Sequence, residues 1–447
     1  MTNIDVTAAY CGDESCAPSV CFVTLGCAKN EVDSAEMAKR VLQAGFSVVE
    51  DAAEADAVVV NTCSFIQAAT EESIEAIFDI CGLENFESGS SKLVVAGCMP
   101  ARYGSDLEGE LAEAKAFVPC SKEDDIVEVL CGVLGVRPRP RDDAQSPFAG
   151  NPASYVKIGD GCDRFCSFCA IPYIRGRYRS FPLDEVRAAV AERVAAGVRE
   201  ITLIAQDTGR WGDDFETPDT TANLVCTLAG EFPETWFRLM YVEPQGVTDD
   251  LLDAIASCDN VCSYLDVPLQ HASKKVLRAM NRAGDAASYR ALVERIRARV
   301  PGIVLRTTVI AGFPGETEQD FEELCAFLED VEFDYVGVFP YSAEEGTRAA
   351  TFDGQIDEDV KIERAQRVRD LGDSIGEAHV SARVGATMDV LVLGREEDGQ
   401  LFGRAMCQAP EVDGVVYTDG GAIGDIVRVR ICDTLVYEME GERIDER

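Results

Sequence analysis

The chain has 447 residues, too many for one ordinary hydrophobic core, which favours two to four domains. Its 41 Lys and Arg against 80 Asp and Glu give a formal net charge of -39, so direct nucleic-acid binding is not expected without a local basic surface. No run reaches the ~18 apolar residues of a membrane span and no signal pattern opens the chain, so we expect a cytoplasmic protein without membrane association. The 18 cysteines then indicate metal ligation and buried thiols rather than disulfides, and the 2 histidines argue against His-rich zinc sites.

Residues 1–20 lack apolar periodicity and are interpreted as a tail, whose Cys11 and Cys16 are interpreted as ordinary thiols. Residues 21–135 alternate short β-rich runs with helical patterns. This alternation predicts an α/β domain with a doubly wound parallel sheet and helices on both faces. Residues 136–153 are rich in Pro, Arg and Asp and have no apolar period, which predicts a linker.

Three cysteines of the first domain occupy equivalent places. Cys27, Cys63 and Cys98 follow directly after the runs CFVTLG, AVVVNT and KLVVAG, and each precedes a helical stretch. Ligands of open α/β sheets bind beyond the carboxyl ends of the strands, so cysteines far apart in sequence can meet there. The alternative is that all three are small buried residues in tight turns. Cys81 and Cys131, late in helical stretches, do not share this placement.

Residues 154–383 contain six strand-helix units followed by a long charged helical stretch over 355–382, which predicts a parallel, partial (β/α)6 barrel with a connector helix. Active sites of such barrels lie at the C-terminal strand ends, which makes the polar residues there candidates: Gln206, Asp207, Glu243, Gln270, His271, Gly312 and Tyr341. Each could instead cap a helix, and His271 could be a base or a hydrogen-bonded wall residue. Gly312 and Gly315 lie in a turn whose backbone could approach a nucleoside closely.

A loop after the first strand of this barrel contains Cys162, Cys166 and Cys169. Thiolates select zinc, copper(I) or iron-sulfur clusters, and a closed structural zinc site would need a fourth ligand that is not nearby. We therefore interpret the loop as an iron-sulfur site. Three cysteines on a four-iron cube leave one iron open.

Residues 384–447 switch to strand alternation with Asp-Gly and Gly-Gly turns, which predicts a small antiparallel β-barrel. The segment has 14 acidic and 6 basic residues, a net charge of -8. An acidic barrel is better suited to a basic protein than to RNA.

The barrel loop resembles the signature of the radical S-adenosylmethionine (SAM) superfamily, C-x3-C-x-(aromatic)-C, with Phe168 as the aromatic residue. In addition, LGCAKNEVDS, NTCSFIQAATEESI and AGCMPARY resemble the three cysteine motifs of the methylthiotransferase family. The last domain resembles the TRAM domain that closes these enzymes. The residues that follow the motif cysteines are most similar to those of the branch that modifies a ribosomal protein. They are Ala-Lys-Asn after Cys27 and Ser-Phe-Ile after Cys63.

This resemblance implies two [4Fe-4S] clusters, one on Cys27, Cys63 and Cys98 and one on Cys162, Cys166 and Cys169. It implies SAM as the ligand of the open iron in the barrel, in a pocket for which the candidates are Phe168, Gln206, Asp207, Gln270, His271, Gly312 and Gly315. It also implies the addition of a methylthio group to the β-carbon of an aspartate in small-subunit ribosomal protein S-twelve, with a reductant and a sulfur source as further partners.

Two alternatives stay open at this point. One is methylthiolation of a tRNA adenosine, which the acidic terminal barrel and the motif wording disfavour. The other is a two-cluster electron carrier or redox sensor without chemistry of its own. Carriers normally close each cluster with a fourth cysteine and have little use for a six-unit barrel.

Overall fold

The structure is a computed structural model that describes residues 17–141 and 146–444. Most of the expected tail, including Cys11 and Cys16, therefore lies outside the described residues. The chain divides into two compact units. Unit 1 comprises residues 1–149 and 170–176, and unit 2 comprises residues 150–169 and 177–447.

Unit 1 is built on a parallel sheet of five strands in the order β2-β1-β3-β4-β5, which confirms the predicted parallel α/β domain. All six residues of β3 are buried, as expected for the β-branched run AVVVNT in the middle of a sheet. After β1 the chain forms β2 on one side of β1 and then β3 on the other side of β1. A topological switch point therefore lies between β1 and β3. The strands are β1 (Ser19–Thr24), β2 (Ser47–Val49), β3 (Ala57–Thr62), β4 (Lys92–Gly97) and β5 (Ala114–Pro119).

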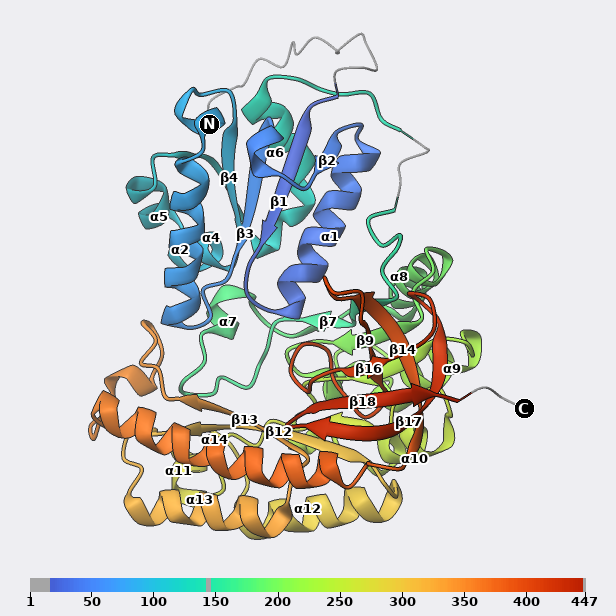
Figure 1. Cartoon of the computed structure of the whole chain (residues 1–447). Coiled ribbons are helices and arrows are strands. Elements are labelled where there is room, and N and C mark those ends of the chain that lie inside the picture. Colours follow the sequence, from blue (N-terminus) through green and yellow to red (C-terminus); the bar gives the residue numbers. More distant parts are fainter. Residues whose placement is uncertain (1–16, 142–145, 445–447) are drawn as a thin grey trace. The chain divides into compact units, whose positions relative to one another are not determined.

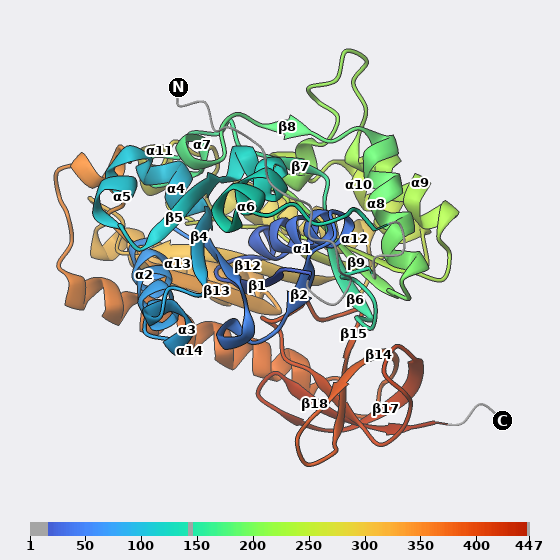
Figure 2. The same ribbon diagram turned by 90° about the horizontal axis from the view of Figure 1, so that it is seen from above.

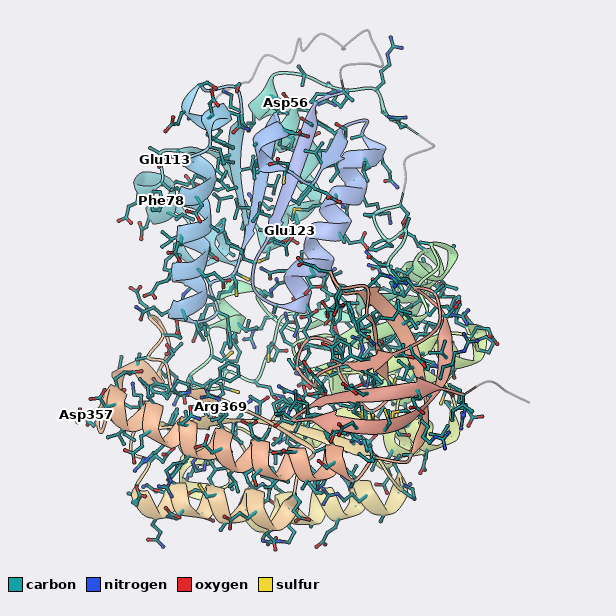
Figure 3. All side chains as sticks on the ribbon, in the orientation of Figure 1. Asp56, Phe78, Glu113, Glu123, Asp357 and Arg369 are labelled. Atoms are coloured by element: carbon teal, nitrogen blue, oxygen red, sulfur yellow. The ribbon has the colours of Figure 1, made fainter. Side chains whose placement is uncertain are left out.

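Helices cover both faces of this sheet (Figure 1). Met37 and Val41 of α1 and Leu130 of α6 pack with one set of strand residues, whereas Ile77 of α2 and Met99 of α4 pack on the opposite face. Side chains fill the space between helices and sheet, while Phe78 points outward from α2 (Figure 3). The helices of unit 1 are α1 (Ala28–Gln43), η2 (Ala52–Glu54), α2 (Gln67–Cys81), α3 (Glu84–Glu87), α4 (Cys98–Tyr103), α5 (Ser105–Glu110), η3 (Cys120–Asp125), α6 (Ile126–Leu134) and α7 (Ile171–Ile174).

Unit 2 contains six parallel strands, which confirms the predicted partial barrel. They form two three-stranded sheets, β6-β9-β10 and β11-β12-β13, and a parallel bridge from Phe237 to Val261 connects the two. The strands are β6 (Ala153–Lys157), β9 (Glu200–Ile204), β10 (Trp236–Leu239), β11 (Tyr264–Asp266), β12 (Val304–Ala311) and β13 (Tyr335–Pro340). A short antiparallel pair, β7 (Gly159–Asp160) with β8 (Arg179–Ser180), follows the first strand.

Helices separate these strands as expected for strand-helix units. A capping box of Thr317 and Asp320 opens α13, and one of Asp285 and Ser288 opens α12. The helices are α8 (Leu183–Ala195), η4 (Thr208–Arg210), α9 (Thr221–Glu231), η5 (Pro244–Gly246), α10 (Asp249–Ser257), α11 (Lys274–Ala279), α12 (Ala286–Arg299), α13 (Glu318–Val331) and η6 (Ala349–Thr351).

The predicted connector is the 24-residue helix α14 (Glu358–Ser381), which packs closely on β13. A Cβ atom added at Gly372 would lie 2.8 Å from the Cβ atom of Val336, so a larger residue would force the helix away from the strand.

A closed five-stranded barrel ends unit 2, with the strand order β14-β15-β16-β18-β17 (Figure 2). The barrel is confirmed, but the expectation that it is antiparallel throughout is wrong for one pair, because β16 and β18 run parallel. A closed ring of five strands cannot alternate direction all the way round, so at least one neighbouring pair must be parallel. The strands are β14 (Thr387–Arg395), β15 (Leu401–Ala405), β16 (Val416–Thr418), β17 (Ile426–Leu435) and β18 (Glu438–Arg443).

Buried charges connect this closed barrel to the six-stranded part of unit 2. Glu200 at the start of β9 accepts hydrogen bonds from Arg238 at 2.9 Å and from Arg404 of β15 at 2.6 Å. Arg238 also donates to the backbone oxygen of Met406 at 2.8 Å. Such an ion network is costly to break, because the remaining partner would be a buried, unpaired charge. Among the described residues, no helix is both long and apolar enough to cross a membrane.

Candidate functional site

The carboxyl ends of three strands in unit 1 bring the three predicted cysteines together. Cys27 follows β1 as the N-cap of α1, Cys63 follows β3, and Cys98 opens α4 after β4. The Sγ atoms of Cys27 and Cys98 lie 3.8 and 3.9 Å from the same oxygen, Oδ1 of Asn30. A Cβ atom at Gly26 would lie 2.8 Å from the Sγ atom of Cys63. The three thiols therefore lie near one another at this edge of the sheet.

Asn30 holds the loops that present these cysteines. It is fully buried, and its Nδ2 atom donates to the backbone oxygens of Leu25 and Thr62, each at 2.9 Å. The residues before two of the cysteines are Gly26 and Gly97, with φ values of +93° and +91°. Such backbone angles favour glycine. In each Gly-Cys pair of the motifs, the turn therefore requires the glycine, and the cysteine supplies the thiol.

A fourth thiol, Cys120, belongs to the same group. It opens η3 directly after β5, and its Sγ atom donates to the Sγ atom of Cys98 at 3.8 Å. Cys120 was not among the predicted ligands, although the run AFVPC places it after a strand, as the other three cysteines are placed. Cys98 and Cys120 pack in a small apolar cluster with Ala170 and Ile174.

Arg175 lies beside the thiols within unit 1. Its guanidinium donates to Asp33 at 2.9 Å, to Oδ1 of Asn30 at 3.0 Å and to the Sγ atom of Cys98 at 3.8 Å. The Cys120 thiol and the Arg175 charge together lower the pKa of Cys98, whereas burial raises the pKa of Cys63 to about 12. Cys98 is thus the more readily ionised of these two thiols.

The second predicted set, Cys162, Cys166 and Cys169, lies in unit 2 after β7. Asn281 holds this loop by donating to the backbone oxygens of Arg164 and Phe165, each at 3.1 Å. Arg282 donates to the Sγ atom of Cys166 at 3.9 Å, and burial raises the pKa of Cys162 to about 11. Phe168, the aromatic residue of the signature, is partly exposed beside Cys169.

The side chains at both sites are of the type that iron-sulfur clusters use. Within residues 17–141 and 146–444, no three His, Cys, Asp or Glu side chains are arranged to hold one metal ion. In a four-iron cube each thiolate binds a different iron, so its ligands are spread more widely than the ligands of one zinc ion. Two separate sets of cysteine side chains, each in a strand-end loop, are a donor set that fits such clusters.

Two predicted pocket residues have free acceptor atoms at the strand ends of unit 2. Asp207 is fully buried and accepts from Nε of Arg164 at 2.6 Å through Oδ2, and Gln206 donates to Asp160 at 2.8 Å. Neither Oδ1 of Asp207 nor Oε1 of Gln206 has a hydrogen-bond partner among the described residues. Burial raises the pKa of Asp207. Buried acceptors without partners are costly, and a ligand with N–H or O–H donors would satisfy them.

His271 has both ring nitrogens engaged. Its Nδ1 atom accepts from the backbone N–H groups of Ala272 and Ser273 at 3.0 and 2.9 Å, so the proton is on Nε2, which lies 3.3 Å from Oε2 of Glu316. His271 is fully buried. This geometry favours the role of a hydrogen-bonded wall residue for His271 over the role of a catalytic base. The adjacent Gln270 has a φ of +72° and pairs with Val309 of β12.

The predicted glycine turn, which contains Gly312 and Gly315, is fixed by contacts with neighbouring residues. The Gly312 N–H donates to the carboxylate of Glu316 at 3.0 Å, and a Cβ atom at Gly312 would lie 2.5 Å from Cγ of Lys361. Gly315, with φ +79°, has open space where its Cβ atom would be, and its N–H donates to the oxygen of Gly354 at 2.9 Å. The open side of the turn is therefore at Gly315.

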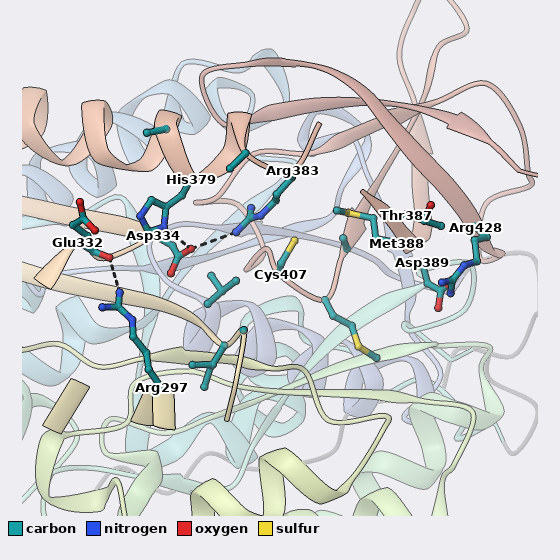
Figure 4. A pocket seen from close by; sticks show the side chains of 17 residues that line it. Arg297, Glu332, Asp334, His379, Arg383, Thr387, Met388, Asp389, Cys407 and Arg428 are labelled. Atoms are coloured by element: carbon teal, nitrogen blue, oxygen red, sulfur yellow. Dashed lines mark hydrogen bonds and ion pairs between the residues drawn. The ribbon is translucent and has the colours of Figure 1, made fainter. Parts of the chain in front are cut away.

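A cavity of about 890 Å³ lies at a different place in unit 2 (Figure 4). It is bounded by the N-terminal ends of β12 and β13, the last turn of α14 and the strands β14 and β15, and its lining includes Asp334, His379, Arg383 and Cys407. Chemistry in parallel barrels occurs at the C-terminal strand ends, so this cavity is not the place of the cysteine loop.

Models of three families match consecutive parts of the chain. Residues 19–119 match the uncharacterized protein family UPF0004, residues 156–328 the radical SAM superfamily, and residues 384–444 the TRAM domain. Solved structures show the same fold. The radical SAM methyltransferase TsrM from Kitasatospora setae, solved with cobalamin and a [4Fe-4S] cluster, has a TM-score of 0.51 at 14% identity, with 73% of this chain and 77% of that chain covered.

Full-length relatives are much more similar in sequence. A protein of Anaeromyxobacter sp. (strain K) is 41% identical over 95% of this chain and 93% of its own length. Proteins of Trichlorobacter lovleyi and Geobacter sulfurreducens are 39% and 40% identical, covering 96% and 95% of this chain and 98% of their own length in both cases. All three are named ribosomal protein uS12 methylthiotransferase RimO. With radical SAM and TRAM domains and relatives of this similarity along nearly its whole length, the chain belongs to the RimO family of radical SAM methylthiotransferases.

Proposed function

We propose that this protein adds a methylthio group to the β-carbon of an aspartate in ribosomal protein uS12, in the cytoplasm. The names of its full-length relatives support the reaction and the substrate. The observation that carries the proposal for this chain is the gathering of Cys27, Cys63 and Cys98 around Asn30, in addition to the three cysteines of the signature loop.

Each set would hold one [4Fe-4S] cluster. Cys27, Cys63 and Cys98 would hold the first, and Cys162, Cys166 and Cys169 the second, with SAM at the barrel mouth. When bound, the barrel cluster supplies the electron that cleaves SAM to a radical able to remove a hydrogen atom from an unactivated carbon, while the other cluster carries the sulfur.

The chain's own residues prepare the barrel site. Phe168, Gln206 and Asp207 are proposed to contact SAM, the last two through their unpartnered acceptor oxygens. Gly315 would allow close approach of the nucleoside. His271 and Gly312 would fix the shape of the turn, because their polar groups already bond to Glu316. Gln270 would help to fix it through its bridge to β12.

Charge supports a protein substrate. The last 64 residues have a net charge of -8 within a chain of -39, which would attract the Lys- and Arg-rich loop of a ribosomal protein and repel a tRNA backbone. Methylthiolation of tRNA is therefore the disfavoured alternative.

A competition experiment tests the proposal. The anaerobically reconstituted protein is given uS12, or its loop peptide, together with unmodified tRNA, SAM, a reductant and sulfide. Mass spectrometry should detect the gain for replacing H by a methylthio group on the aspartate of uS12, with a yield that falls as salt rises. Modification of the tRNA alone would disprove the proposal, and cluster binding without transfer to either substrate would contradict it as well.

A further inference from the structure

The sulfur of Cys98 differs from the other two thiols of its triad in what surrounds it. Cys120 and Arg175 both donate to it, each at 3.8 Å. The amide oxygen of Asn30, an acceptor, lies 3.8 Å from the Cys27 sulfur and 3.9 Å from the Cys98 sulfur, and Cys63 has a backbone hydrogen bond with Phe65. The two side-chain donors are therefore what distinguish Cys98. Two donors of different kinds therefore converge on one sulfur atom of the proposed first cluster site.

We infer that Cys120 and Arg175 are positioning residues that raise the reduction potential of the cluster held by Cys27, Cys63 and Cys98, by donating hydrogen bonds to the Cys98 sulfur. This inference rests on the proposed function, since it requires a cluster at that triad. Reduction adds negative charge to a cluster, and hydrogen bonds to its sulfur ligands stabilise that charge.

Arg175 is held firmly in place for this role. Its side chain is only 2% exposed and pairs with Asp33, which is 1% exposed, while a further bond reaches Asn30. The nitrogen Nη2 of the guanidinium makes all three contacts, so its two hydrogens are shared among Asp33, Asn30 and Cys98. Because the guanidinium is always charged, the Cys98 sulfur faces a positively charged donor. In the sequence Arg175 closely follows Cys169, so the segment just after the radical SAM signature supplies the donor to the other cysteine set.

Cys120 is placed as a donor rather than as a fourth ligand. Its sulfur lies 3.8 Å from the sulfur of Cys98, a distance that suits an S–H···S hydrogen bond. Two ligands of one cube bind different irons and are held apart by it. A fourth cysteine ligand would also occupy the open iron that the transferred sulfur needs.

The effect has a use in the reaction. Joining a carbon radical to a methylthiolate forms the C–S bond and leaves one electron over. An oxidised cluster held by this triad would accept that electron, and a higher reduction potential would make it a better acceptor.

The test uses the full chain with Cys162, Cys166 and Cys169 changed to Ala, so that only the first cluster is present. After anaerobic reconstitution, iron is counted and the midpoint potential is measured by a redox titration followed by electron paramagnetic resonance. Cys120→Ala should keep the iron content and shift the potential to a more negative value. Cys120→Ser, which keeps a donor, should restore part of the shift.

Arg175 is tested in parallel. Arg175→Met would leave Asp33 buried and unpaired, so it is combined with Asp33→Asn, and Arg175→Lys serves as the variant that keeps the charge. The double variant should lower the potential, and Arg175→Lys should lower it less. Cys131→Ala is the matched control, because Cys131 is a buried thiol on α6 in a different core cluster. Its potential should equal that of the parent.

The outcomes separate the inference from the proposed function. Full iron content with unchanged potentials in the Cys120 and Arg175 variants would overturn the inference and leave the cluster in place. Loss of iron in Cys120→Ala would also overturn it, because Cys120 would then be a ligand. If the parent itself binds no iron while folded, the proposed cluster fails and the inference fails with it.

Discussion

The imidazole of His271 lies 3.3 Å from the carboxylate of Glu316, and both side chains are completely buried. Glu316 also accepts from the N–H groups of Gly312 and Phe313 and from Arg364 at 2.8 Å. One carboxylate thus connects the end of β12, the turn before α13 and the helix α14. This explains why a glycine turn at the barrel mouth keeps its shape.

We predict that Glu316→Gln destabilises unit 2 by about 1–3 kcal/mol. The change removes the buried carboxylate that accepts from Gly312 and Arg364, while Arg364 keeps its second partner, Glu318, at 2.9 Å. Urea unfolding followed by circular dichroism measures the loss. Glu322→Gln is the matched control, since Glu322 of α13 pairs with Arg367 of α14 at the surface, and it should cost less than about 1 kcal/mol. Equal effects of the two changes would contradict the role given to Glu316.

Iron content tests the two cysteine sets. With Cys162, Cys166 and Cys169 changed to Ala, the reconstituted protein should keep about four irons of the about eight expected for two cubes. Iron and sulfide analysis with Mössbauer spectroscopy gives the count. A folded triple variant that retains eight irons, or none, would be incompatible with separate cysteine sets.

SAM cleavage should depend on one set alone. The variant with Cys27, Cys63 and Cys98 changed to Ala should still produce 5'-deoxyadenosine from SAM under reducing conditions, yet transfer no sulfur, because Phe168 and the signature spacing belong only to the barrel loop. Chromatography of the products measures both reactions. Production of 5'-deoxyadenosine by the variant that lacks the barrel cysteines would refute this assignment.

His379 should make stability depend on pH. The hydrogen bond with Asp334 at 3.0 Å raises the pKa of His379 above its usual value (Figure 4). Arg383, 3.5 Å from the same carboxylate, and Glu332 and Arg297 are the other charged groups nearby. Because the folded pKa is the higher one, His379 contributes stability in full below about pH 6.5, and this contribution disappears as pH rises through the folded pKa.

The comparison of the wild type with His379→Gln isolates this contribution. The difference in unfolding free energy should be larger at about pH 6 than at about pH 9, as measured by urea unfolding at both values. All other titrating groups are common to the two proteins and cancel in the difference. A difference in unfolding free energy that is constant over this range, or that grows toward high pH, would contradict the role given to the His379–Asp334 hydrogen bond.

Much of the architecture was predictable from the sequence. The runs CFVTLG, AVVVNT and KLVVAG and the helical patterns between them predicted the parallel sheet of unit 1, because strand and helix periods are local properties of the chain. The same reasoning predicted the six-stranded part of unit 2 and the connector α14. The position of Cys27, Cys63 and Cys98 at strand ends was also readable, since the carboxyl ends of parallel strands lie at one edge of the sheet.

The sequence by itself therefore determined the elements, their order and the two cysteine sets. The tertiary structure alone decided that Cys120 meets Cys98, that Arg175 joins unit 1, that both nitrogens of His271 are engaged, and that β16 pairs parallel to β18. The physical reason is common to all four. Each depends on which elements become neighbours in space, and that is set by sheet order, barrel closure and the packing of many side chains together, which no local period in the sequence encodes.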